Sequence, residues 1–297
     1  MRKDTRAQRG NPERRPPGDR TGQPSARSAA PRRPEQEATE LVYGLRACMA
    51  VFRMRRHDIR RLAFSSELRD ELDDLPDWAA DAGIDWREEP AVELDRLAQS
   101  NQHEGVVMLT APRRWLKPKD LATLLVERRG VAIALDRVRN PQNIGAVLRS
   151  AAFFGVDAAL LGAPAPDPGL SAFAVRVAEG GAEHVELSRT TDLAQTLATL
   201  RARGVKIIGG DGHANTTLAE LEPARPCVIV FGHEREGLGS RIRAECDQLV
   251  EIKGTGAVES LNVGVAAGIF IARVIPRPSA MPRVSGGHGL TNPPRRP

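Results

Sequence analysis

Six short apolar runs alternate with stretches of helical character in the second half of the chain, and this alternation limits the possible fold most strongly. The runs are rich in valine, isoleucine and leucine and are bounded by glycine or polar residues, as buried strands are. They cover residues 131–136, 156–161, 184–187, 205–209, 227–231 and 248–252. Helices between most of them predict a parallel sheet covered on both faces, and therefore an α/β fold.

A second, smaller mixture of helices and strands occupies residues 38–110, which we expect to form a small α/β domain. The spacing of apolar residues predicts helices at 40–53, 68–82 and 92–98 and strands at 59–64, 84–88 and 106–109. Residues 111–127 contain four basic side chains around two prolines, which predicts a basic linker. The larger domain then covers residues 128–275.

The charge of the chain is divided between basic ends and an acidic body. The net charge is +5 over 297 residues, of which residues 1–34 carry +7 and residues 276–297 carry +4, so residues 35–275 carry −6. Few large apolar side chains occur in residues 1–37, and we expect 1–37 and 276–297 to be disordered basic tails. Such tails favour an anionic polymer as partner through counterion release, although a solubilising extension has the same composition.

Neither a membrane span nor a secretion signal is expected. No run of about 18 apolar residues occurs, and the charged N-terminus lacks an apolar segment. The cysteines Cys48, Cys227 and Cys246 have neither metal-binding nor redox spacing, so we expect reduced packing residues in a cytoplasmic protein. His103 has no partner at ligand spacing, and no metal site is expected.

Polar side chains follow three of the predicted strands, where α/β folds bind ligands. After the first strand, NPQNIGAVLR places Asn143 at the start of a helix and Arg149 among its apolar residues. A helix cap and a surface cation would explain both, but an arginine on an apolar helix favours a carbonyl or anionic partner. After the fifth, FGHEREGLG places Gly232 and Glu234 in a glycine-rich loop. No dinucleotide fingerprint or Walker loop occurs, which argues against a Rossmann enzyme.

The third of these junctions changes character within a few residues. A strand ends at Ile252, a glycine-broken loop contains Gly254, and Ser260 and Asn262 precede a helix of small residues expected at 263–272. The first turn of such a helix has free N–H groups and the positive end of the dipole. A helix cap and a turn residue are the structural alternative for this serine and asparagine. Three such junctions at one sheet edge favour a ligand site.

Together, the segments NPQNIGAVLRSAAFFG, FGHEREGLG and IKGTGAVESLNVGVAAG resemble the SpoU, or TrmH-like, RNA ribose 2′-O-methyltransferases of the SPOUT class. The resemblance covers roughly residues 125–275, and residues 40–110 are similar to the family's substrate-binding domain of the ribosomal-protein L7Ae/L30e type. It implies a SpoU-type methyltransferase domain with a C-terminal trefoil knot, S-adenosyl-L-methionine as cofactor and a homodimer. The implied reaction is methylation of a ribose 2′-hydroxyl in rRNA or tRNA, without a metal.

The matching motif positions imply two sets of site residues. The cofactor-binding residues are Gly232, Ile252, Gly254 and Leu261. The catalytic residues are Asn143, Arg149, Glu234, Ser260 and Asn262. In this scheme the arginine first orients the ribose and stabilises the developing negative charge, and only second accepts the proton, because acting as a base would require a neutral guanidinium. Two departures from the family, Lys253 for proline and Gly264 for serine, are expected to alter the cofactor loop and to loosen helix packing.

Clustered arginines outside these junctions predict contacts with RNA phosphates, although a solvated helix end would also explain them. They lie at the first helix–strand junction and in the linker, and are Arg53, Arg55, Arg56, Arg60, Arg61, Arg113 and Arg114. The main alternative function is a non-catalytic RNA-binding paralogue that retains the methyltransferase fold. The intact set of expected catalytic residues favours the enzyme.

Overall fold

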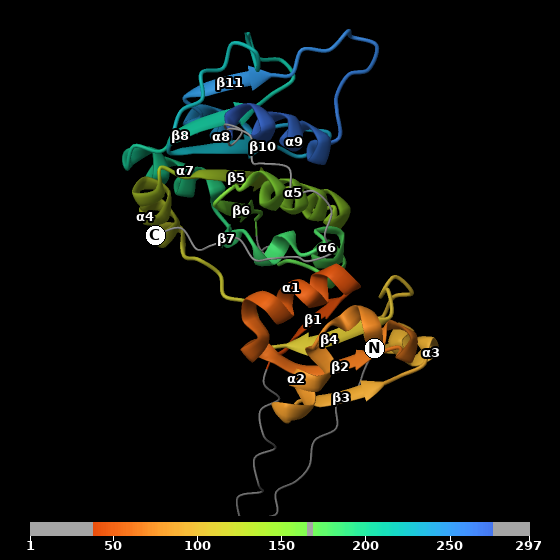
Figure 1. Ribbon diagram of the computed structural model, residues 1–297. Helices are drawn as coiled ribbons and strands as arrows, with labels where there is room; N and C mark the ends of the chain where they lie inside the picture. The colour runs from red at the N-terminus through yellow and green to blue at the C-terminus, as the bar shows by residue number, and fades with distance from the viewer. Residues whose placement is uncertain (1–37, 165–168, 276–297) are drawn as a thin grey trace, which may run out of the picture. The chain divides into compact units, whose positions relative to one another are not determined.

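A parallel sheet forms the centre of the C-terminal part of the chain, as predicted, and it has seven strands where six were expected (Figure 1). The computed structural model describes residues 38–164 and 169–275, and the predicted basic tails lie outside them. The strand order is β7-β6-β5-β10-β8-β11-β9. The strands are β5 (Val131–Asp136), β6 (Ala158–Gly162), β7 (Glu186–Thr190), β8 (Lys206–Gly210), β9 (Thr216–Thr217), β10 (Cys227–Phe231) and β11 (Gln248–Glu251). All predicted strands of this sheet are therefore confirmed, and only the two-residue β9 was missed.

A second sheet of four strands, with the order β1-β4-β2-β3, lies in the smaller α/β region. Its strands are β1 (Glu40–Tyr43), β2 (Ile59–Phe64), β3 (Asp85–Glu88) and β4 (Val106–Thr110). Its helices are α1 (Leu45–Arg55), η1 (Arg56–Asp58), η2 (Ser66–Leu72), α2 (Leu75–Asp81) and α3 (Ala91–Ala98). Pairing is antiparallel except between β2 and β3.

Helices cover both faces of the large sheet, because each of its central strands is apolar on both sides. They are α4 (Pro118–Arg128), α5 (Pro141–Phe154), α6 (Ala172–Val177), η3 (Gly181–Glu183), α7 (Leu193–Ala202), α8 (Ser240–Glu245) and α9 (Val263–Val274). Ile133 packs into the core beneath α5 and α9, whereas its neighbours Ala132 and Ala134 pack into the core beneath α4 and α7. The sheet is therefore the middle of three layers, with a separate apolar core on each of its two faces.

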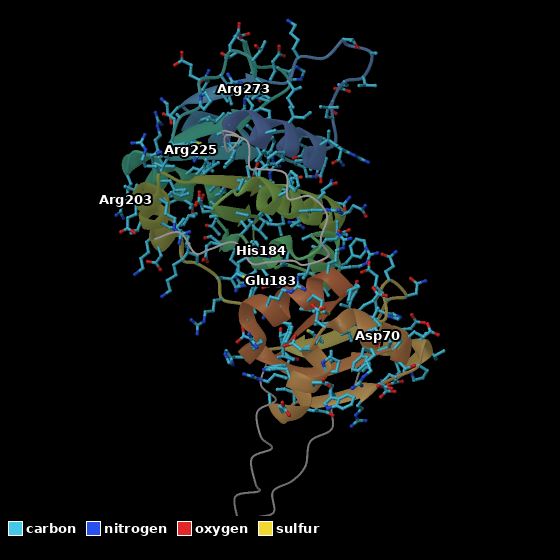
Figure 2. The ribbon with its side chains drawn as sticks, viewed as in Figure 1. Asp70, Glu183, His184, Arg203, Arg225 and Arg273 are labelled. Carbon is cyan, nitrogen blue, oxygen red and sulfur yellow. The ribbon has the colours of Figure 1, made fainter. Side chains whose placement is uncertain are left out.

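A buried ionic cluster joins the smaller region to the larger domain. At its centre is Glu183 (labelled in Figure 2). Arg55 Nε donates to Glu183 Oε2 at 2.8 Å, and Arg113 Nη2 donates to Glu183 Oε1 at 3.1 Å. Glu40 Oε1 accepts from Arg113 Nε at 2.7 Å. Burial opposes the charge of Arg55, but the hydrogen bond and the negative charges of Glu183, Glu40 and Asp58 outweigh it and raise the pKa of this guanidinium.

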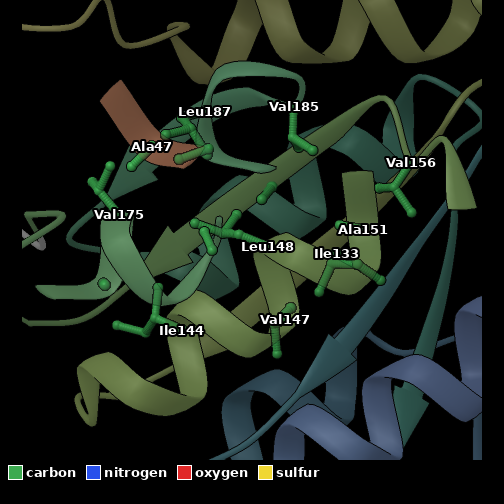
Figure 3. Close-up of a cluster of buried hydrophobic side chains, with 14 of the residues drawn as sticks. Ala47, Ile133, Ile144, Val147, Leu148, Ala151, Val156, Val175, Val185 and Leu187 are labelled. Carbon is green, nitrogen blue, oxygen red and sulfur yellow. The ribbon is translucent and has the colours of Figure 1, made fainter. Parts of the chain in front are cut away.

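Apolar contacts accompany the ionic cluster. Ala47 of α1 belongs to the same buried cluster as Val147 and Leu148 of α5 and Val175 of α6 (Figure 3). Within this cluster Leu148 and Val175 are fully buried. Removing such apolar surface from water stabilises the contact by roughly 25 cal/mol per Å².

Three predicted boundaries were wrong, each for a local reason. The helix predicted at 40–53 begins only at Leu45, because 40–43 form β1 and Gly44 turns the chain with a φ of +94°. The helix predicted at 68–82 divides into η2 and α2 at Asp73, which has a φ of +51°. The second half of the predicted linker forms α4, because Leu121 and Leu125 bury an apolar face.

The three cysteines are free thiols. Burial raises the pKa of Cys227 to about 12, so this thiol stays neutral at physiological pH. Within the part of the chain that the structure describes, no helix is long and apolar enough to span a bilayer. In the same residues, no group of three His, Cys, Asp or Glu side chains is placed to hold a metal ion.

Candidate active site

Two side-chain hydrogen bonds connect the three polar junctions that the sequence singles out. Asn143 Nδ2 donates to Glu234 Oε1 at 2.8 Å, and Asn262 Nδ2 donates to Asn143 Oδ1 at 2.9 Å. An ionised carboxylate only accepts hydrogen bonds, so the amide of Asn143 presents its nitrogen to Glu234 and its oxygen to Asn262. Residues that lie 91 and 119 positions apart in the sequence are thereby held in one fixed arrangement.

The start of α5 shows why Asn143 is available for these bonds. The helix is capped by Asn140, whose side chain accepts from the N–H of Gln142 at 3.0 Å. Asn143 therefore does not serve as the cap, and its side chain is buried. The simple capping explanation is wrong for this residue.

The start of α9 differs, because Asn262 is both the helix cap and a member of the cluster. Its Oδ1 accepts from the N–H of Gly264 at 2.8 Å while its Nδ2 reaches Asn143. A Cβ on Gly264 would lie 3.0 Å from the Cβ of Ala146 in α5. Gly264 was expected to loosen helix packing, but here it permits close approach of α9 to α5.

Arg149 and Ser260 are not joined to the hydrogen-bonded cluster. Arg149 lies six residues after Asn143 on α5, and its Nη1 donates to Glu179 Oε1 at 2.8 Å. Glu179 also pairs with Arg46 at 3.3 Å, and the side chain of Arg149 is 56% exposed. Ser260 is exposed in the loop between β11 and α9. Within one chain, the structure thus brings together three of the five expected catalytic residues.

A cavity of about 580 Å³ opens at the carboxyl ends of β8, β10 and β11. All four residues expected to bind the cofactor line it, as do Glu234 and Ser260; the four are Gly232, Ile252, Gly254 and Leu261. Phe231, Val263 and Phe270 supply an apolar floor. Its size and its combination of apolar floor and polar rim suit a nucleoside-sized ligand.

The turn after β10 shapes one wall of this cavity. Two backbone hydrogen bonds between His233 and Gly237, of 3.1 and 2.8 Å, close the turn. Gly232 is enclosed by it, because a Cβ there would lie 2.2 Å from the carbonyl carbon of Gly237. Only glycine fits, so the backbone of the wall stays accessible to a ligand. An S-adenosylmethionine-sized molecule therefore fits the residues present.

A shallower groove of about 410 Å³ adjoins the cavity. Asn143 and Glu234 line it together with Arg139, His233 and Arg235, none of which the sequence singled out as a site residue. These three residues could have been found from their neighbours in the sequence. Arg235 and His233 flank Glu234, and Arg139 lies just before the NPQN segment. Charged loop residues have no periodicity, so their convergence is visible only in three dimensions.

Two of the arginines predicted to contact RNA are unavailable for that role. Arg55 and Arg113 point into the ionic cluster with Glu183 and Glu40, and their side chains are 14% and 6% exposed. A phosphate could reach them only by displacing buried carboxylates, so this part of the prediction is wrong. The others are exposed, and for them RNA contact stays a prediction: Arg53, Arg56, Arg60, Arg61 and Arg114.

Comparisons with known proteins agree with this geometry. A model described as the SpoU rRNA Methylase family matches residues 130–272, and one for RNA 2′-O ribose methyltransferase substrate binding matches residues 41–116. A protein of Mycobacterium avium (strain 104), named as an uncharacterized tRNA/rRNA methyltransferase, is 33% identical over 261 residues, 86% of this chain and 84% of its own. A similarly named Mycolicibacterium smegmatis protein is 36% identical over 198 residues, 66% and 63% of the two chains.

Solved structures share the fold at lower identity. An rRNA methyltransferase from Sinorhizobium meliloti has a TM-score of 0.67 at 21% identity, covering 80% of this chain and 87% of its own. The SpoU methyltransferase AviRb from Streptomyces viridochromogenes, in complex with the cofactor AdoMet, has a TM-score of 0.66 at 21% identity, covering 80% and 89%. AdoMet is S-adenosylmethionine, the cofactor expected from the sequence.

The fold is a parallel sheet with a cavity at its carboxyl edge, and the relatives are named tRNA/rRNA methyltransferases. The protein is therefore an RNA methyltransferase. Within that class, the chain belongs to the SpoU rRNA methylase family.

Proposed function

We propose that the protein transfers a methyl group from S-adenosylmethionine to a ribose 2′-hydroxyl of rRNA or tRNA. One observation carries this proposal. Glu234, Asn143 and Asn262 are linked by hydrogen bonds, and they lie beside a cavity that all four expected cofactor residues line. The match of residues 41–116 to the substrate-binding model of RNA 2′-O ribose methyltransferases supports the choice of ribose. An rRNA or tRNA substrate agrees with the cytoplasmic location expected from the sequence.

The cavity would hold the cofactor through the backbone around Gly232, Ile252, Gly254 and Leu261, above the apolar floor. The bound cofactor supplies an electrophilic methyl group on a sulfonium. Transfer then depends mainly on placing the hydroxyl in line with that group, which is a positioning task. The rigid amide of Asn143, fixed from both sides, is suited to orient the ribose or the loop that contacts it.

The ribose hydroxyl is a weak nucleophile. Negative charge develops on its oxygen as the bond to the methyl group forms, and the hydroxyl proton is released to water. A guanidinium stabilises such charge without losing its own proton. We assign this role to Arg149, whose side chain is 56% exposed, so that its salt bridge to Glu179 can exchange for a substrate contact. Ser260, which lines the cavity, is assigned to the contact between cofactor and ribose.

A homodimer is part of the proposal. Apolar side chains are exposed on α5 and α9, which pack against each other: Phe153 is 82%, Val265 52% and Ile269 39% exposed. A second copy would cover these side chains and would bring a further surface close to Arg149, which shares α5 with Phe153. We therefore expect light scattering to give the mass of a dimer, and a fully active monomer at micromolar concentration would contradict this part.

The resemblance to the family also motivates three structural parts of the proposal. The C-terminal segment is tucked through a loop as a trefoil knot, residues 38–110 form an L7Ae/L30e-type domain, and residues 128–275 form the methyltransferase domain. The adjacency of the loop before α9 to the turn after β10, which line the same cavity, supports the knot.

The test of the proposed function combines binding and transfer. Calorimetry should show S-adenosylmethionine binding and no NAD binding. Incubation with methyl-tritiated cofactor and total RNA from a strain that lacks the gene should label rRNA or tRNA, and mapping should locate a 2′-O-methyl group. Cofactor binding without transfer to any RNA would favour the non-catalytic paralogue, and base methylation would overturn the ribose assignment.

A further inference from the structure

The groove beside the proposed cofactor cavity contains two arginines that have no acidic partner among the described residues. Arg139, just before α5, and Arg235, in the turn after β10, both line it and are exposed. Within residues 38–164 and 169–275, no Asp or Glu lies within ion-pair distance of either. By contrast, Arg137 on the same loop is paired with both Asp136 and Glu236. Among residues 38–164 and 169–275, nothing acidic therefore competes with a ligand for these two cations.

His233 adds a third donor to the same groove. Its Nδ1 accepts from the backbone N–H groups of Arg235 and Glu236 at 3.3 and 3.4 Å. In the neutral ring the proton consequently resides on Nε2, which presents a donor. His233 and Glu234 line both the groove and the cofactor cavity, so the two spaces adjoin at these residues.

The charge of the groove favours an anion of modest size. Its titratable lining groups are Arg139, Arg235, His233 and Glu234. The Glu234 carboxylate is occupied by the Asn143 amide, and with a neutral histidine the formal charge is +1. Guanidinium groups match the oxygens of a phosphate particularly well.

We propose that this groove binds the phosphate 3′ to the methylated nucleotide, with Arg139 and Arg235 as positioning residues. This inference rests on the proposed function. In RNA the 2′-hydroxyl and the 3′-phosphate are attached to adjacent ribose carbons, so a group that holds this phosphate also locates the 2′-oxygen. A phosphate in the groove places that oxygen toward His233 and Glu234, where the groove meets the cofactor cavity.

The first experiment measures methyl transfer to total RNA by the double variant Arg139→Ala/Arg235→Ala. Its matched control is Arg129→Ala/Arg203→Ala, which removes two exposed arginines outside the groove (Arg203, Figure 2). We expect kcat/KM for RNA to fall about 10- to 100-fold in the groove variant, because two charge-assisted hydrogen bonds are lost. The control variant should lose much less, and both should bind S-adenosylmethionine like the wild type.

The second experiment tests the position of the phosphate. An RNA oligonucleotide with the mapped target nucleotide is prepared with a phosphodiester or an uncharged methylphosphonate on its 3′ side. The wild type should lose kcat/KM on this replacement, whereas the groove variant, which has already lost the contact, should lose little more. This non-additivity is the signature of a direct contact.

Several results would overturn the inference. Equal kcat/KM for the groove and control variants would show that the arginines act only through general charge. Weaker S-adenosylmethionine binding in the groove variant would assign the groove to the cofactor, and additive losses in the second experiment would assign it to another phosphate. Absence of transfer by the wild type itself would overturn the proposed function and this inference with it.

Discussion

Asn143 has two different neighbours, and only one orientation of its amide serves both. Its nitrogen faces the Glu234 carboxylate and its oxygen faces the Asn262 amide. Asn143 itself is 5% exposed, and a buried amide needs partners for both its nitrogen and its oxygen. An asparagine, with a donor and an acceptor on one planar group, is the residue that such a site requires.

Replacing this amide by a carboxylate should break the cluster. In Asn143→Asp the new oxygen faces Glu234 where a donor is needed, so we expect the free energy of unfolding to fall by about 2–3 kcal/mol at pH 7. Lowering the pH should restore part of it, because one protonated carboxyl again donates to the other. Urea denaturation at several pH values measures this.

Glu234→Gln is the matched control, since the glutamine oxygen still accepts from Asn143. It should cost less than about 1 kcal/mol in stability. If Asn143→Asp were as stable as Glu234→Gln at neutral pH, the hydrogen-bonded cluster would not be important for the fold.

Arg149 permits a separate prediction about catalysis. Arg149→Ala should abolish methyl transfer while S-adenosylmethionine affinity stays within about tenfold, because Arg149 does not line the cavity. Arg149→Lys should rescue little, since a single ammonium cannot reproduce the planar guanidinium. Single-turnover methylation and calorimetry measure the two effects, and near-normal turnover of Arg149→Ala would reject its role.

At the scale of the secondary-structure elements, the turn after β10 determines the shape of the proposed cofactor cavity. It brings the backbone of Gly232 so close to Gly237 that no side chain fits between them. The loop after β11 forms another wall but is open, and a Cβ on Gly254 would meet no atom within 4 Å. Two glycines that the sequence presents as similar therefore have different structural roles.

The pair Gly232→Ala and Gly254→Ala tests this difference. Gly232→Ala should lower the free energy of unfolding by about 1–3 kcal/mol, because the turn has to open to admit the methyl group. It should also weaken S-adenosylmethionine binding at least tenfold, whereas Gly254→Ala should stay within about 0.5 kcal/mol in stability. Thermal denaturation and calorimetry give both quantities. Equal behaviour of the two variants would contradict the steric explanation.

At the scale of the whole molecule, charge is distributed unevenly along the chain. Residues 35–275 carry −6, yet the proposed substrate is a polyanion, so the basic residues of 1–34 and 276–297 should supply much of the long-range attraction. Deleting residues 1–34 should flatten the plot of log affinity against log salt, because each phosphate contact contributes roughly 0.7–0.9 to its slope.

The measurement is an RNA titration at several salt concentrations, with the full chain compared with residues 35–297. S-adenosylmethionine binding should be unchanged, because the cavity lies within residues 210–270. Target choice should also persist, since contacts with phosphates do not distinguish bases. Equal salt slopes would mean that the folded domains alone capture the RNA.

The sequence by itself determined six of the seven strands of the large sheet, its parallel α/β class and the three junctions with polar residues, because apolar periodicity and glycine-rich turns are local signals. It failed where a local pattern was ambiguous, as at 40–53, where β1 and α1 meet at Gly44. Only the tertiary structure decided which polar residues meet. It joined Asn143 to Glu234 and Asn262, and turned Arg55 and Arg113 inward to Glu183. It also placed Arg139 and Arg235 in one groove, with no acidic partner in the part of the chain that the structure describes. The reason is physical: the partner of a charge or an amide is set by distances between elements far apart in the chain.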